Sequence, residues 1–195
     1  MTSSERIRLL LDKKIPDCMG LYEHFWGETI SQAWPEQGFP KNIPMEDLFN
    51  YDIQNVGGWF DSESFPGRSE VLQESDEWTV TRDGRGATLK NWKNKSGTPE
   101  HIDFEVTTPE IWKTYREPLL TLNRARLGNI DDTKNTLAAA RAKGRFAIYG
   151  NLFVFELLRG TLGDVNFLPA LLLEPEWIRD FCQVYLDHFR IHYEV

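Results

Sequence analysis

Residues 145–163 constrain the fold more than any other part of the chain. They begin with a short apolar run over residues 146–149, which is typical of a strand buried on both faces. Gly150 and Asn151 interrupt the run, and the segment after them is apolar and long enough for two helical turns. A strand, a tight turn and a helix make one βα step, and parallel α/β folds bind ligands just past the strand.

Two other apolar runs predict further strands of the same kind, over residues 18–22 and 51–56. Polar groups follow each run, with His24 after the first and Asp61 after the second. If the three strands lie side by side and run in the same direction, His24, Asp61 and Glu156 converge at one rim.

The pattern changes between residues 64 and 105, where apolar and polar side chains alternate in part. Residues 83–86 read Asp-Gly-Arg-Gly, which favours a hairpin because glycine supplies the positive φ that such turns require. We therefore expect a small antiparallel β-insertion with one solvated face. Residues 90–97 are basic, and we expect them to form an exposed flap.

Helix signals lie on either side of these segments. Thr2 and Glu5 have capping-box spacing and predict a first helix over about residues 3–13. Thr108 followed by Pro109 predicts another helix, which ends before Pro118. Further helices are predicted over residues 27–34, 132–143 and 169–173, and from residue 175 onward.

Charge and composition narrow the class of partner. The chain has 195 residues and a net charge of −8, and no block of Lys or Arg interrupts it, so nucleic acid is not an expected partner. Its two cysteines fit neither a disulfide framework nor a metal-ligand motif. No run reaches membrane-spanning length, and residues 1–14 do not form a signal peptide. We expect a cytoplasmic protein with a small-molecule substrate.

The order of these parts resembles the uroporphyrinogen decarboxylase (URO-D) superfamily. The resemblance rests on residues 5–17, on 51–53 with 59–61, on 148–163, and on 174–177 with the helix that follows. That family forms a TIM (β/α)8 barrel nearly twice as long as this chain. The resemblance implies that residues 1–195 are a single partial barrel domain of about three βα units, with the β-insertion at about 64–105.

Departures from the family pattern bear on the reaction. The haem-pathway decarboxylase carries two arginines after its first strand that hold substrate carboxylates, and His24 and Glu28 stand at those positions here. Glu28 would repel a carboxylate, and a family tyrosine falls near Leu158, which cannot donate a hydrogen bond. The chain therefore resembles the corrinoid-dependent methyltransferase branch more closely. In that branch zinc is held by His and Cys from later strands, and a corrinoid protein is the partner.

Several candidate site residues have a structural interpretation as well as a functional one. His24 and Asp61 are the candidate catalytic residues; His24 would act as a general acid/base or substrate hydrogen bonder, or else simply begin a helix. The candidate substrate-binding residues are Trp26, Glu28, Trp59, Asn151, Glu156 and Arg159. Glu156 and Arg159 share a helix face, either as a solvated ion pair or aimed into a pocket. Trp26 and Trp59 form either an aromatic wall for a substrate ring or part of the core.

No metal site is assigned to this segment. His188 and His192 have the i, i+4 spacing of two ligands on a helix, but a third ligand is not evident in the sequence. Zinc and a corrinoid protein are expected only for a complete barrel.

Three functions remain open. The first is a URO-D superfamily methyltransferase acting on a small methylated substrate. The second is uroporphyrinogen III decarboxylase itself, a lyase of porphyrin biosynthesis. The third is a non-catalytic fragment or docking module, whose partner would be the missing C-terminal half of the barrel, a corrinoid protein or a second copy.

Overall fold

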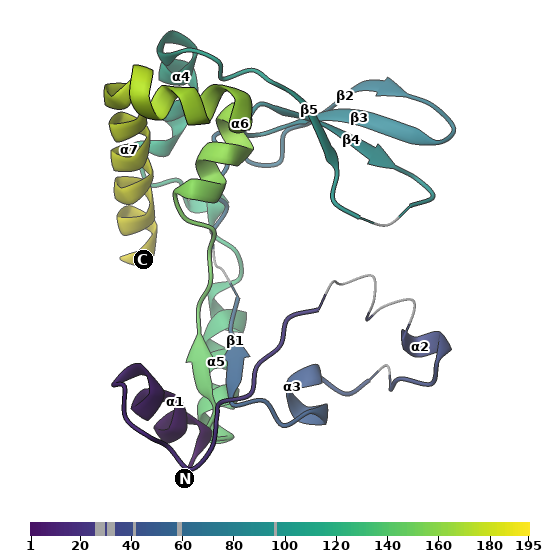
Figure 1. Ribbon diagram of the computed structural model, residues 1–195, viewed down its shortest axis with the longest axis vertical. Coiled ribbons are helices and arrows are strands. Elements are labelled where there is room, and N and C mark those ends of the chain that lie inside the picture. The colour runs from purple at the N-terminus through teal and green to yellow at the C-terminus, as the bar shows by residue number, and fades with distance from the viewer. Residues whose placement is uncertain (26–29, 31–33, 41, 58–59, 96) are drawn as a thin grey trace. The chain divides into compact units, whose positions relative to one another are not determined.

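The computed structural model describes residues 1–25, 30, 34–40, 42–57, 60–95 and 97–195 (Figure 1). The fold is mixed α/β, with a two-stranded parallel sheet and a separate four-stranded antiparallel sheet. The chain forms two compact units. The first contains residues 1–59 and 129–151, and the second contains residues 60–128 and 152–195.

The first unit is built on a parallel pair of strands, β1 (Ile53–Asn55) and β6 (Phe146–Ile148). Ile53 lies opposite Phe146 and Asn55 lies opposite Ile148, so both strands end at the same edge. Helix α5 (Ile130–Ala142) leads into β6 and packs beside it (Figure 1). The predicted strands at 51–56 and 146–149 are confirmed as parallel neighbours, although each is shorter than expected.

Helix α1 (Ser3–Leu11) begins with the predicted capping box, in which the Thr2 hydroxyl accepts from the Glu5 amide. The Glu5 carboxylate in turn accepts from the Thr2 amide at 2.7 Å. The first unit also contains two short helices, α2 (Trp34–Glu36) and α3 (Met45–Leu48). Most of the helix predicted over residues 27–34 lies outside the described residues.

The strand predicted over residues 18–22 is wrong, because this segment is irregular. Its amides bond to side chains instead of to a neighbouring strand: Cys18 donates to the Asp17 carboxylate and Leu21 donates to the Asp52 carboxylate. Met19 is 77% exposed, so the apolar run is not buried. Gly20 packs so closely on α1 that a Cβ would lie 2.3 Å from Ile7 Cδ1.

The second unit contains the predicted antiparallel insertion. Its sheet has the order β2 (Ser69–Glu74), β3 (Trp78–Asp83), β4 (Ala87–Trp92) and β5 (Glu100–Phe104) (Figure 1). The hairpin between β3 and β4 is confirmed, and Asp83 closes it by accepting from the amides of Arg85 and Ala87.

The expected flap at residues 90–97 is wrong for its first three residues, which belong to β4. Lys90 is held on this strand because its ammonium group lies 4.3 Å from the centroid of the Trp92 ring and 4.9 Å from that of Trp78.

Helices complete the second unit. As predicted, α4 (Pro109–Arg116) begins at Thr108, whose hydroxyl accepts from the Ile111 amide. The 3-10 turns η2 (Glu117–Leu119) and η3 (Arg124–Arg126) follow, and the later helices are α6 (Phe155–Leu173) and α7 (Pro175–Tyr193). Trp112 of α4 stacks on Phe181 of α7 at 4.5 Å between ring centroids, and both side chains are buried.

Helix α6 joins the two helical segments predicted on either side of residue 163. Gly163 breaks the regular backbone with φ of +72°, and a Cβ at this position would lie 2.3 Å from Cε2 of Phe104 in β5. The glycine therefore allows the helix to bend and to lie directly on the sheet.

Candidate functional site

The candidate site is a pocket of about 240 Å³ beside β1, which we call the β1 pocket. Its walls include His24 and the residues on either side of it, together with Asn55, the last residue of β1. The side chains used below are Tyr22, Glu23, His24, Phe25, Glu46 and Tyr51. The pocket thus combines a residue singled out from the sequence with the end of a parallel strand.

A carboxylate network holds the irregular segment against β1. Asp52, immediately before the strand, accepts from the Leu21 amide at 2.8 Å, and its own amide donates to the Leu21 carbonyl at 2.9 Å. Arg6 of α1 binds the Asp52 carboxylate and also Asp17, at 2.7 Å and 2.9 Å. Burial opposes ionisation of Asp52, but hydrogen bonds from Ser3, Leu21 and Arg6 outweigh it, so its pKa is lowered. Asp52 therefore stays ionised and fixes the chain that leads into His24.

Aromatic rings form one wall of the pocket. Tyr51 is 5% exposed, and Tyr22 meets it edge to face with 6.1 Å between ring centroids. Phe49 stacks on Tyr51 at 6.0 Å, and Phe25 packs against Trp34 at 4.8 Å. These contacts fix the positions of three rings that line the pocket, Tyr22, Phe25 and Tyr51.

His24 is exposed and lines this pocket. Its backbone amide donates to the Glu23 carboxylate at 2.8 Å, which fixes the main chain at this residue. An imidazole at a pocket wall can donate or accept a hydrogen bond. The structure thus places His24 where it can act on a bound molecule.

The charge of the pocket is negative. Glu23 and Glu46 both line it, and none of its lining residues within the described part of the chain is Lys or Arg. Burial raises the pKa of the Tyr51 hydroxyl, and the nearby carboxylates of Glu23 and Glu46 raise it further. The negative charge of these two carboxylates therefore reaches the Tyr51 hydroxyl, which belongs to a lining residue.

Asn55 and Glu46 are pocket residues that the sequence did not single out. Asn55 ends β1, so the strand-end rule that selected His24 and Asp61 could have found it. Its side-chain oxygen accepts from the Gly57 amide at 2.7 Å. Glu46 lies in α3 and reaches the pocket only through tertiary packing, so no local signal marks it. Asn151 is exposed beyond β6 and does not line this pocket.

Asp61 is in the second unit and supports a loop. Its carboxylate accepts from the Glu63 amide at 2.8 Å, and its backbone amide donates to the Arg126 carbonyl at 2.9 Å. The guanidinium of Arg126, 3% exposed, donates to the carbonyls of Asp61, Glu63, Ser64 and Pro118. Since His24 belongs to the other unit, the convergence of His24, Asp61 and Glu156 at one rim stays a prediction.

Glu156 and Arg159 form the ion pair expected from their spacing, at 3.2 Å on α6. Arg159 also contacts Asp164 at 3.0 Å, and these two carboxylates raise the pKa of its guanidinium. All three side chains are more than 40% exposed, which matches a solvated ion-pair group. The other candidates, Trp26, Glu28 and Trp59, lie outside the described residues.

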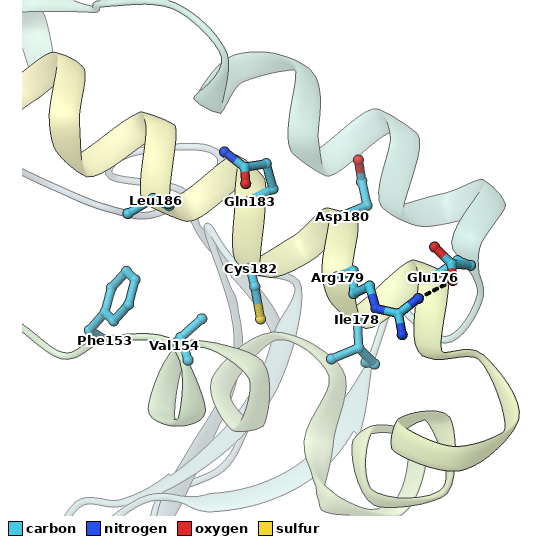
Figure 2. Close-up of a pocket in the computed structure, with 9 residues that line it drawn as sticks. All are labelled: Phe153, Val154, Glu176, Ile178, Arg179, Asp180, Cys182, Gln183 and Leu186. Atoms are coloured by element: carbon cyan, nitrogen blue, oxygen red, sulfur yellow. Dashed lines mark hydrogen bonds and ion pairs between the residues drawn. The ribbon is translucent and has the colours of Figure 1, made fainter.

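A second concavity, of about 720 Å³, lies between α7 and the segment that leads into α6 (Figure 2). Its walls are mostly apolar, with Phe153, Val154 and Ile178 among them, and Cys182 points toward α6 (Figure 2). Burial raises the pKa of the Cys182 thiol, so the nucleophilic thiolate is disfavoured. Glu176 and Arg179 at the rim pair with each other. This groove has the composition of a packing surface.

His188 and His192 are buried core residues. Nδ1 of His188 donates to the Leu119 carbonyl at 2.8 Å, and Nδ1 of His192 donates to the His188 carbonyl at 2.7 Å. Across the described ranges, no group of three or more His, Cys, Asp or Glu side chains is placed to hold a metal ion. The two histidines therefore serve packing and hydrogen bonding.

No family model, curated protein or solved structure matches this chain. Within the part of the chain that the structure describes, no helix combines the length and apolar character needed to cross a bilayer.

Proposed function

We propose that this chain is the N-terminal part of a URO-D superfamily barrel of the corrinoid-dependent methyltransferase type, and that its β1 pocket binds a small methylated substrate. One observation carries the proposal: His24 lies in a pocket lined by β1 of the parallel pair along its whole length, including Asn55 at its carboxyl end. Parallel α/β folds bind their ligands at this edge. In this proposal His24 orients the substrate by a hydrogen bond and donates or accepts a proton.

The size and charge of the pocket favour a small methylated compound over a porphyrinogen. At about 240 Å³ the pocket lies below the roughly 300–1,000 Å³ typical of sites for drug-sized ligands. A uroporphyrinogen also carries carboxylates, which need guanidinium or ammonium partners. Among the described residues, the charged ones that line the pocket are Glu23 and Glu46, which would repel such a substrate.

The described residues do not provide a ligand set for zinc, so no step is assigned to a metal in this chain. The corrinoid protein and any zinc belong, in this proposal, to the complete barrel. The contribution of this chain is to bind and orient the substrate through Tyr22, His24 and Tyr51.

The substitution His24→Asn tests this proposal. Asparagine keeps a hydrogen-bonding side chain but is shorter and lacks the imidazole ring, so we expect binding to weaken several-fold. Binding is measured by NMR titration of the full chain with small methylated alcohols, thiols and amines, and with uroporphyrinogen.

His101→Asn is the matched control, because His101 is an exposed histidine on β5 of the second unit. It should leave binding unchanged. Tight binding of uroporphyrinogen, or binding that is insensitive to His24→Asn, would contradict the proposal.

A docking role is the second candidate, favoured by an exposed apolar face on α6. Val165 and Leu172 are each 86% exposed and Leu168 is 51% exposed, and their spacing places them on one side of the helix. In this proposal the face is covered by the remaining half of the barrel, because the family barrel is nearly twice as long as this chain. The molecular mass in solution, with and without that half, tests it.

A further inference from the structure

The β1 pocket has a second property besides its place beside β1: it is suited to a positive charge. Glu23 and Glu46 bring two carboxylates to its walls, and no described lining residue carries a guanidinium or ammonium group. One Glu23 oxygen accepts from the His24 amide, which fixes this carboxylate against the backbone of His24. Arg145 donates to the side chain of Gln54, a lining residue, at 3.3 Å, but its guanidinium is paired with Asp47 at 2.7 Å. The two glutamates therefore set the charge of the pocket, which favours a cation over an anion.

The aromatic wall adds a second attraction for cations. Tyr22, Phe25 and Tyr51 all line the pocket, and the edge-to-face packing of Tyr22 on Tyr51 sets the two rings at 64° to each other. Aromatic faces attract cations, and such rings are the usual recognition device for methylated ammonium groups. Tyr51 is buried, so its ring is in place before a ligand arrives.

We propose that the β1 pocket binds a methylated ammonium group, tertiary or quaternary, between the tyrosine rings and the carboxylates of Glu23 and Glu46. This inference rests on the proposed function and names its substrate class. A methylammonium group fits better than a metal ion, because the described residues offer no set of three or more metal ligands. It also fits better than a bare ammonium, because methyl groups pack on the rings and on Met45 and Ile53.

The test compares choline with 3,3-dimethyl-1-butanol, which has the same shape but carbon in place of the charged nitrogen. Both are titrated into the full chain, and the NMR signals of Tyr22 and His24 are followed. We expect choline to bind about tenfold more tightly, since the rings and the carboxylates recognise the charge.

Variants separate the two contributions. Glu46→Gln and Glu23→Gln should each weaken the binding of choline several-fold, since each removes one negative charge. Binding of the neutral alcohol should stay unchanged. Tyr22→Leu should weaken the binding of choline, because it removes an aromatic ring. Tyr22 is 37% exposed, so we expect the variant to fold. Glu77→Gln is the matched control, a carboxylate removed from the second unit.

The outcomes distinguish this inference from the function on which it rests. Equal binding of choline and its neutral analogue would overturn the cation preference and leave a small-molecule pocket in place. If neither compound, nor any of the methylated alcohols and thiols, shifts Tyr22 or His24, the proposed function fails as well. Choline binding that Glu46→Gln and Glu23→Gln do not weaken would overturn the assignment to this pocket.

Discussion

Single buried polar residues have well-defined structural roles in this chain. Arg126 illustrates this: its guanidinium donates to four carbonyls, and burial lowers its pKa. Because Arg126 orders the loop around Asp61, the acidic residue selected from the sequence belongs to a structural assembly. A strand-end carboxylate was a reasonable candidate, but its partner lies 65 residues away and could not be foreseen.

His188 should make stability depend on pH. Burial lowers its pKa from 6.5 to about 4, so the unfolded chain binds a proton in this range while the folded chain does not. Its contribution is complete above pH 6.5 and is lost as the pH falls toward 4, by about 3 kcal/mol in total. Urea unfolding measured at pH 7.5, 6, 5 and 4.5 gives this slope.

The substitution His188→Asn should reduce that slope, because asparagine can still donate to the Leu119 carbonyl but does not titrate. Its stability at pH 7.5 will be lower, since part of the ring volume is lost. His101→Asn, at an exposed site, should keep the wild-type slope. An unchanged slope in His188→Asn would show that another group titrates instead.

Elements with local sequence signals were predicted well. The capping box at Thr2, the start of α4 at Thr108 and the β3–β4 hairpin are each specified by neighbouring residues, and all three are confirmed. The strand at residues 18–22 was wrong because two aspartates, Asp17 and Asp52, compete for its amides. β5 was not predicted as a separate strand, because only two of its five residues, Ile102 and Phe104, are apolar.

The residues that line the β1 pocket could be predicted from the sequence only in part. His24 could be selected because it follows an apolar run and carries useful chemistry. Other lining residues come from α3 and from Tyr51, which reach the pocket through packing between segments distant in sequence. Aromatic contacts of this kind leave no periodic pattern in the chain, so only the fold reveals them.

Gly163 is expected to be essential for the bend of α6. In Gly163→Ala the new Cβ would meet the Phe104 ring at 2.3–2.8 Å, and φ of +72° would strain an alanine. We expect a loss of about 2–4 kcal/mol in the free energy of unfolding, measured by urea titration.

Gly160→Ala is the matched control in the same helix. Its Cβ would meet only the flexible end of Arg85, at 3.2 Å, and alanine favours the helix. This variant should be close to neutral. Comparable losses for the two variants would show that the contact with Phe104 does not decide the cost.

The whole molecule consists of two units, each assembled from two separated stretches of chain. Residues 60–128 depart from the first unit and residues 129–151 return to it, so β1 and β6 pair across a long excursion. The parallel pair and the antiparallel sheet follow from the structure, and membership of both in one barrel domain stays a prediction.

If α6 docks a partner, Leu168→Glu combined with Leu172→Glu should prevent association. Both side chains are exposed, so the change should have little effect on the stability of the chain itself. Sedimentation of the chain with the remaining barrel half would show the complex for wild type only. Leu122→Glu, at another exposed leucine, should leave the complex intact. Equal association of all three proteins would exclude this face.

Asp52 connects α1 to the β1 pocket. Arg6 lines no part of the β1 pocket, yet through Asp52 it holds Leu21, which leads directly into Tyr22 and His24. A change at the N-terminal helix would therefore alter how tightly a molecule is held several residues away without touching it. Selection for binding would act on the first turns of the chain as well as on the residues in contact with the ligand.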